Sequence, residues 1–103
     1  MDKETYRIQA EYCKALSHPT RIKILYYLEN GERCVCEIVP FLEDEQSNVS
    51  RHLAVLRRAG ILSRRKEGVS VYYRVRDEKV FEILALVLES LQKAATQKYA
   101  SFT

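Results

Sequence analysis

Glycine and proline are scarce in this sequence, with three glycines and two prolines among 103 residues. This scarcity excludes collagen-like and low-complexity chains, and a composition of 47% hydrophobic and 30% charged residues is typical of a globular protein. Long apolar runs are also absent, because the longest, Ile83 to Leu88, is far too short to span a bilayer. We therefore expect one domain over residues 1–103 and no membrane partner.

The N-terminus and the cysteine content exclude further classes. The first residues, Met1 to Glu4, are charged and are followed by no apolar signal core. The three cysteines are an odd number, so we expect no disulfide framework and a reduced, cytoplasmic protein. A thiol enzyme or metal carrier is the least favoured class, because the chain has no Cys-x-x-Cys, no second catalytic group and no cofactor loop. We predict a protein that is not an enzyme and has no catalytic cofactor.

Positive charge is concentrated in one quarter of the chain. Between Arg51 and Arg76 there are eight basic residues and one acid, Glu67, which give this stretch a net charge of +7. The rest of the chain carries −4 of the total of +3. Such a segment is either a basic face exposed to solvent or a positively charged surface that attracts phosphates. The pattern around the charges favours the phosphate-binding surface.

Apolar residues recur at helical spacing in four segments before Gly60. They predict helices over residues 4–16, from Pro19 to Asn30, from Cys34 to Leu42 and over about 46–59. The third and fourth helices lie four residues apart, which is typical of a helix-turn-helix.

After Gly60 the apolar period changes from that of a helix to that of a strand. Two segments, Leu62–Lys66 and Ser70–Arg76, are separated by a turn and predict a two-stranded ribbon. Asp77 then caps a last helix. The fold we predict is mainly α with a small β-hairpin, a winged helix-turn-helix with additional N- and C-terminal dimerisation helices. Its parts are the helix-turn-helix at about 34–60, the wing at about 61–76 and the C-terminal dimer helix at about 77–96.

The fourth helix has the two faces that a DNA-reading helix requires, an apolar stripe for docking and a polar face for the major groove. Short hydroxyl and amide side chains near its start can contact base edges or phosphates, and the basic hairpin can follow the DNA backbone. Taken singly, a Ser-x-x-Ser pattern is usually an exposed face and a lone histidine is usually structural. Together they predict DNA contacts from Gln46, Ser47, Asn48, Ser50, Arg51, His52, Arg64, Arg65, Lys66, Tyr73 and Arg74.

Five motifs in combination resemble the ArsR/SmtB family of metal- and metalloid-responsive repressors. They are His18–Arg21, Cys34–Ile38, Gln46–Leu53, Leu56–Ile61 and Tyr72–Arg74, and the resemblance covers roughly residues 10–90. The resemblance implies a homodimer that binds double-stranded DNA at an inverted-repeat operator and leaves it when a ligand binds. It also implies that the alternate-thiol motif is a clamp for a metalloid or heavy metal.

Cys34 and Cys36 are the predicted ligands of that clamp. As(III), Sb(III), Cd(II) and Pb(II) are soft ions that favour thiolate, so a sensor for them should bring at least two cysteines together. Two thiols at i and i+2 on a regular helix point apart, so this pair converges only if the helix start is unwound or the pair precedes it. Cys13 is a possible third ligand, or else a small core residue of the first helix.

The sequence departs from the family's arsenic pattern at one thiol position. Val39 stands where a third thiol is found, so two protein sulfurs would hold As(III) with an exogenous thiol as the third. The family's other metal site, on the last helix, requires histidine, and residues 77–98 contain none. We therefore expect no zinc-type site there.

Two further expectations concern function and assembly. The alternative to metal sensing is a thiol redox switch in a repressor of the same fold, in which Cys34 and Cys36 are oxidised to a disulfide or sulfenate. From Val80 to Leu91 the apolar residues cover more than one narrow stripe of the last helix. We expect the first and last helices to pair across a two-fold axis.

Overall fold

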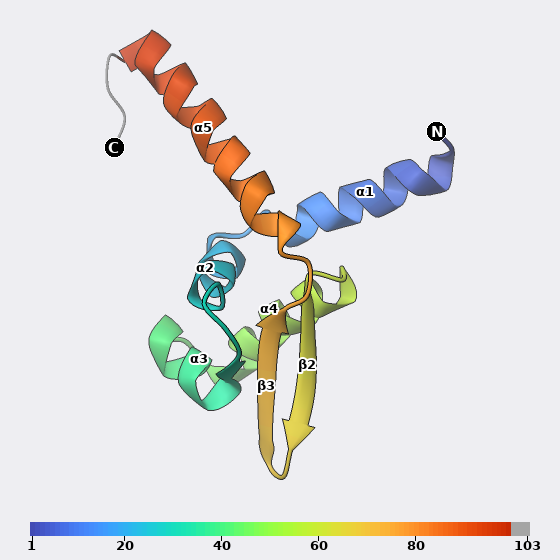
Figure 1. Ribbon diagram of the computed structural model, residues 1–103, viewed down its shortest axis with the longest axis vertical. Coiled ribbons are helices and arrows are strands. Elements are labelled where there is room, and N and C mark those ends of the chain that lie inside the picture. Colours follow the sequence, from blue (N-terminus) through green and yellow to red (C-terminus); the bar gives the residue numbers. More distant parts are fainter. Residues whose placement is uncertain (100–103) are drawn as a thin grey trace.

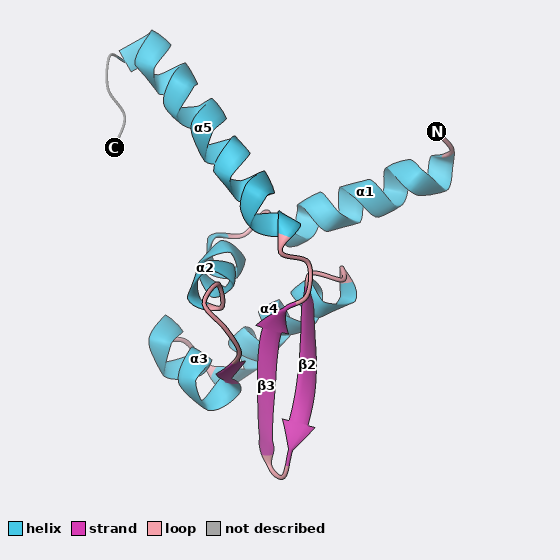
Figure 2. Ribbon diagram, in the orientation of Figure 1, coloured by secondary structure: helices cyan, strands magenta, loops and turns pink. Residues whose placement is uncertain are grey.

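The computed structural model describes residues 1–99, with side chains described as far as Ala95. Helices α2, α3 and α4 form a compact body beside a small sheet, and α1 and α5 project from it as two diverging arms (Figure 1). Figure 2 shows the same arrangement with helices and strands distinguished by colour. The elements are α1 (Lys3–Ala15), α2 (Pro19–Tyr27), β1 (Arg33–Cys34), α3 (Val35–Leu42), α4 (Gln46–Arg58), β2 (Leu62–Glu67), β3 (Ser70–Val75) and α5 (Lys79–Tyr99).

Local capping contacts set the helix limits. The Asp2 carboxylate accepts a hydrogen bond from the Thr5 N–H at 2.9 Å at the start of α1. His18 caps α2, whose first residue is Pro19, a position where a missing N–H costs nothing. Glu43 ends α3 with a φ of 52°, the left-handed conformation common at helix ends.

The core lies between the three body helices and the sheet. Its fully buried side chains include Ile24 and Leu25 from α2, Ile38 from α3, and Leu53 and Leu56 from α4. Each helix therefore contributes one apolar face, and their burial holds α3 and α4 at a fixed angle beside the wing. This arrangement confirms the predicted winged helix-turn-helix.

The sheet contains one strand more than the predicted ribbon. Its order is β1-β3-β2, and both pairings are antiparallel. In β1, Arg33 pairs with Tyr73 and Cys34 with Tyr72, so the residues just before α3 are hydrogen-bonded to the wing. The turn between β2 and β3 includes Gly68 with a φ of 60°, a conformation that favours glycine.

The two arms expose apolar side chains along much of their length. On α5, Leu86, Val87 and Leu91 are each about half exposed or more, and on α1 the same holds for Tyr6. None of the helices within residues 1–99 combines the length and the apolar character that a bilayer-spanning segment requires.

A hydrogen bond joins the bases of the two arms. The Tyr12 hydroxyl of α1 donates to the Asp77 carboxylate at 2.9 Å, just before α5. Burial and this carboxylate raise the pKa of Tyr12 to about 12, so the phenol stays protonated. Asp77 also accepts from the Lys79 N–H at 3.2 Å, as predicted for a residue that caps the last helix.

Candidate thiol site and nucleic-acid interface

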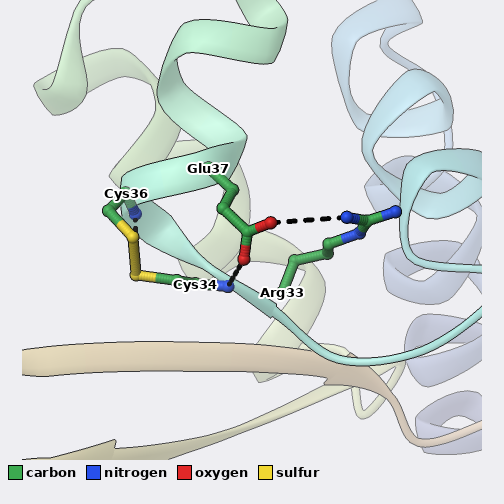
Figure 3. The surroundings of a disulfide bond; sticks show 4 residues. All are labelled: Arg33, Cys34, Cys36 and Glu37. Carbon is green, nitrogen blue, oxygen red and sulfur yellow. Dashed lines mark hydrogen bonds and ion pairs between the residues drawn. A yellow bond between two sulfur atoms is a disulfide. The ribbon is translucent and has the colours of Figure 1, made fainter.

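Cys34 and Cys36 lie where β1 meets α3, and their sulfurs are joined in a disulfide (Figure 3). Cys34 is the N-cap of α3, with an extended backbone at φ −72° and ψ 145°. The two Cα atoms lie 5.0 Å apart, and the extended backbone of Cys34 turns its side chain toward that of Cys36. Two side chains at i and i+2 inside a regular helix would point apart. The expected convergence at an unwound helix start is confirmed. The disulfide joins the two cysteines that the redox alternative had paired.

The helix start is held by a reciprocal pair of hydrogen bonds. The Cys36 N–H donates to the Cys34 sulfur at 3.0 Å, and the Cys34 N–H donates to the Glu37 carboxylate at 3.2 Å. Arg33 forms an ion pair with Glu37 at 3.3 Å, and its guanidinium lies 4.6 Å from the centre of the Tyr27 ring (Figure 3 shows Arg33, Cys34, Cys36 and Glu37). The sulfur of Cys34 is thus part of the cap of the helix that precedes α4.

Cys13 lies apart from this pair. It is an exposed free thiol on α1, so it is not a core residue of the single chain. Within the described part of the chain, no group of three or more cysteine, histidine or acidic side chains could hold a metal ion. One protomer therefore supplies two converging sulfurs, Cys34 buried and Cys36 exposed.

A cavity of about 480 Å³ connects the thiols to the elements predicted to bind DNA. Besides Cys34 and Cys36, its walls include Gln46 and Ser50 of α4 and Arg64 of β2. Val39, which stands in the place of a third thiol, also lines it. A group bound to the sulfurs would share this space with the polar face of α4 and with the wing.

The two faces of α4 are separated as predicted. Val49, Leu53 and Leu56 are fully buried, whereas Gln46 and Ser50 are exposed. Ser47 and Arg51 are also exposed on this helix. A basic and polar helix surface that is free of core contacts is suited to the major groove.

Asn48 is engaged in a local network at the start of α4. Its side-chain N–H donates to the Asp44 carboxylate at 3.1 Å, and its oxygen accepts from Arg51 at 3.2 Å. The bonds from Asn48 and from the Glu45 N–H lower the pKa of Asp44, which favours its charged form. Glu45, the N-cap, makes no side-chain capping bond, so the first N–H groups of α4 have no side-chain cap to compete with a phosphate.

The four wing cations that were predicted to contact DNA are all exposed, but acidic side chains hold Arg65 in place. Arg64, Lys66 and Arg74 are exposed on β2 and β3. Arg65, also a predicted DNA contact, donates two hydrogen bonds to Glu32 at 2.8 and 2.9 Å and one to Glu67 at 2.8 Å. It also lies 4.4 Å from the centre of the Tyr72 ring.

The pair between Arg65 and Glu32 links the wing to the loop before β1. Hydrogen bonding to Arg65 is the main cause that lowers the pKa of Glu32, and hydrogen bonding to Glu32 is the main cause that raises the pKa of Arg65. Glu32 was missed by the sequence reasoning, because a single acid in a short loop has no pattern. The run of basic residues in the wing was the feature of the sequence that could have indicated a nearby acidic partner.

Two predicted DNA contacts are buried. Tyr73 is 5% exposed and belongs to the core, because the inward face of β3 carries it beside Val71 and Val75. His52 is 6% exposed, and its Nδ1 lies 3.1 Å from an Arg21 nitrogen. Because neither side chain is exposed to solvent, we do not include Tyr73 or His52 in the candidate DNA-binding surface.

The chain is similar in sequence to known transcription regulators. Residues 18–64 match the family described as "Bacterial regulatory protein, arsR family". An uncharacterized HTH-type transcriptional regulator of Methanocaldococcus jannaschii, MJ1325, is 46% identical over 84% of this chain and 98% of its own length. A cadmium resistance regulatory protein CadC homolog of Staphylococcus aureus is 43% identical, over 73% of this chain and 63% of the relative. The arsenical resistance operon repressor of Escherichia coli is 40% identical, over 69% of this chain and 62% of the relative.

Solved structures share the fold along almost the whole chain. Rv0081 of Mycobacterium tuberculosis superimposes with a TM-score of 0.81 at 34% identity, covering 94% of this chain and 98% of that one. A homodimeric winged helix-turn-helix DNA-binding domain from Mycobacterium bovis, described as a possible ArsR-family regulator, gives 0.78 at 29% identity. That match covers 96% of this chain and 94% of the other.

Proposed function

Because the chain belongs to the arsR family of bacterial regulatory proteins, we propose that it represses transcription and leaves its operator when a thiophilic ion binds Cys34 and Cys36. Like its relatives, it is a DNA-binding transcriptional regulator and not an enzyme. The main support for this proposal is the cavity that the two cysteines share with Gln46, Ser50 and Arg64. Occupation of the sulfurs and occupation of the DNA surface therefore compete for the same region. We expect such a regulator to act in the cytoplasm.

The proposed inducer is As(III), with Sb(III) as its close analogue and Cd(II) or Pb(II) as alternatives. Thiolates select these soft ions, and the two sulfurs already lie together at the helix start. Relatives named for arsenical and cadmium resistance support this choice. Since Val39 replaces a third thiol in the cavity, we propose that a small exogenous thiol completes the coordination of As(III).

The proposed coupling passes through the cap of α3. The Cys34 sulfur accepts the Cys36 N–H, and Cys34 is also paired with Tyr72 in the sheet. A bond from the sulfur to an ion withdraws electron density from that acceptor and fixes its direction, which changes the helix start and the end of β1. Because α3 packs directly on α4 and the sheet, the positions of both DNA-binding elements respond.

The proposed DNA surface combines α4 and the wing. Gln46, Ser47, Asn48, Ser50 and Arg51 would face the major groove, where amide and guanidinium groups can read base edges. Arg64, Lys66 and Arg74 would contact the backbone, and Arg65 would position the wing through Glu32.

We propose a homodimer paired through α1 and α5 that reads an inverted repeat. The exposed apolar residues of both arms need a partner, and a two-fold axis would present two α4 helices to successive turns of DNA. The homodimeric structural relative from M. bovis supports this assembly.

A second candidate function is redox sensing at the same thiols, which the Cys34–Cys36 disulfide favours. Hydrogen peroxide would accept two electrons from the two thiols as the S–S bond forms, and it would leave as two waters that carry the two thiol protons. The disulfide would then alter the α3 cap in place of an ion.

The test is a titration of reduced protein on labelled DNA from its own promoter. As(III), Sb(III), Cd(II), Pb(II), Zn(II) and hydrogen peroxide are added side by side, with and without a small thiol. Release by As(III) and Sb(III) at the lowest concentrations supports the metalloid proposal. Release by peroxide alone selects the redox candidate, and release by Zn(II) alone contradicts both.

A further inference from the structure

His52 is a buried titratable group on the helix proposed to read DNA, and the thiol mechanism does not use it. Its ring lies on the inner face of α4, beside the ring of His18 with centroids 4.4 Å apart. Its Nδ1 lies 3.1 Å from a guanidinium nitrogen of Arg21 on α2. Arg21 also donates to the carbonyl oxygens of Ala15 at 2.7 Å and Lys14 at 3.2 Å. The cluster therefore joins the end of α1, the start of α2 and the middle of α4.

The contact with Arg21 fixes where the proton of His52 lies. A guanidinium has only donors, so Nδ1 of His52 must accept, and the neutral ring carries its proton on Nε2. His18 is restricted in the same way, because its Nδ1 accepts the Thr20 N–H at 3.1 Å in the cap of α2. Protonation of Nδ1 of His52 would break the bond to Arg21 and place two cations in contact.

The surroundings of His52 oppose its charged form. Burial lowers the pKa of His52 most, and the charges of His18, Arg21 and Arg51 lower it further. Asp44, in the turn before α4, acts in the opposite direction and is the smallest of these influences. Because the folded pKa lies below the unfolded one, the unfolded chain binds more protons between the two values. Stability is therefore complete above the ordinary histidine pKa and falls as the pH drops through that window.

We propose that His52 gives this regulator a second input, in which mild acid loosens the junction of α1, α2 and α4 and weakens DNA binding. This response to pH is separate from the thiols, since the contacts of His52 within the described residues are to Arg21 and His18 and not to Cys34 or Cys36. Its sign is distinctive. A histidine that touches phosphate strengthens DNA binding when it takes up a proton, whereas a buried histidine paired with an arginine weakens it.

The chain offers a sharp test because it contains two histidines, His18 and His52. His52→Asn keeps an acceptor near the place of Nδ1 but cannot titrate. The matched control His18→Asn keeps an acceptor for the cap of α2, where asparagine is favoured, and leaves His52 as the titrating group. Binding to the promoter duplex and unfolding by urea are both measured on reduced protein between about pH 5.5 and about pH 7.5, which brackets the ordinary histidine pKa.

We expect wild type and His18→Asn to lose DNA affinity and stability as the pH falls, and His52→Asn to lose much less of either. An equal loss in His52→Asn, or a gain of affinity by wild type in acid, would overturn the proposal. Nitrogen NMR of the wild-type rings supplies a readout that needs neither DNA nor a variant. It should show His52 neutral with its proton on Nε2 at pH about 7.5. A proton on Nδ1 there would also overturn the proposal.

Discussion

Cys34 belongs to two elements at once, as the last residue of β1 and the N-cap of α3. Its sulfur accepts a helix N–H, while its backbone is paired with Tyr72 of the wing. A chemical change at this one atom therefore acts on the sheet and on the helix-turn-helix together. This position accounts for the proposed coupling between thiol chemistry and DNA binding without any longer path through the core.

Arg51 is the side chain of α4 whose charge we expect to matter most for DNA affinity. Arg51→Gln should weaken operator binding and lower the salt slope of the binding constant by about 1, because one phosphate contact is lost. Fluorescence anisotropy at several salt concentrations measures both. The control Lys23→Gln removes a charge on α2 that lies over the Phe41 ring and is not among the predicted DNA contacts. If both variants keep the wild-type slope, Arg51 does not contact phosphate.

The chemistry of a side chain was a poorer guide to its place in the structure than the spacing of its element. His52 lies three positions after Val49 and four before Leu56, so helical spacing alone puts it on the buried stripe. Tyr73 alternates with Val71 and Val75 in the same way. Both were predicted to contact DNA because their chemistry suits such contacts. The spacing of their elements instead places both side chains on the buried face. The two sulfurs were assigned correctly as a converging pair, because geometry was considered first.

At the scale of elements, the wing is attached to the thiol segment from two sides. β1 pairs with β3, and Glu32 holds Arg65 of β2 through two hydrogen bonds. The Glu32 and Arg65 side chains are 30% and 50% exposed, so the ion pair is screened and contributes little to global stability. We propose that it positions the wing.

Glu32→Gln should therefore loosen the wing without unfolding the protein. The neutral amide keeps the size of the side chain but loses the charge-assisted bonds to Arg65. We expect faster hydrogen exchange at the amide of Arg33 and weaker operator binding, with a nearly unchanged melting temperature. The matched control is Glu67→Gln, which removes the other acid on Arg65 but leaves the link to the loop before β1. Equal exchange in both variants would contradict this role.

Long elements were predictable and short ones were not. The stripe of α4 and the alternation of β3 repeat often enough to specify a helix and a strand. β1 comprises Arg33 and Cys34 alone, and two residues have no period. Its existence depends on β3 offering a free edge, which is a property of the tertiary fold. The third strand, and the link to Glu32 beside it, therefore became visible only in the structure.

At the scale of the whole molecule, the diverging arms α1 and α5 expose apolar side chains that a single chain does not bury. An apolar hollow on α5 is lined by Ile83, Leu86, Val87 and Leu91 with one serine among them, and the four apolar side chains are exposed. Burying this surface against a second copy removes apolar area from water, which is the main driving force for such association. Two DNA-binding bodies would then be held at a fixed spacing.

Leu86→Glu should separate the dimer, because a charge placed in this apolar surface would be buried without a partner. We expect a monomer by light scattering, with operator affinity lost as the second half-site contact disappears. Val69→Glu makes the same chemical change at the wing tip, where the side chain is 99% exposed. The control should remain dimeric. A dimeric Leu86→Glu protein would show that α5 is not the pairing surface.

Arsenite added to the reduced protein on labelled operator DNA, compared with its Cys34→Ser variant, tests the coupling between sulfur and DNA most directly. Serine is a favoured N-cap, so the variant should fold and bind DNA like wild type. Cys13→Ser serves as the control for loss of a thiol outside the clamp. We predict that arsenite releases wild type and Cys13→Ser but leaves Cys34→Ser bound. Release of all three proteins at the same arsenite concentration would contradict the account.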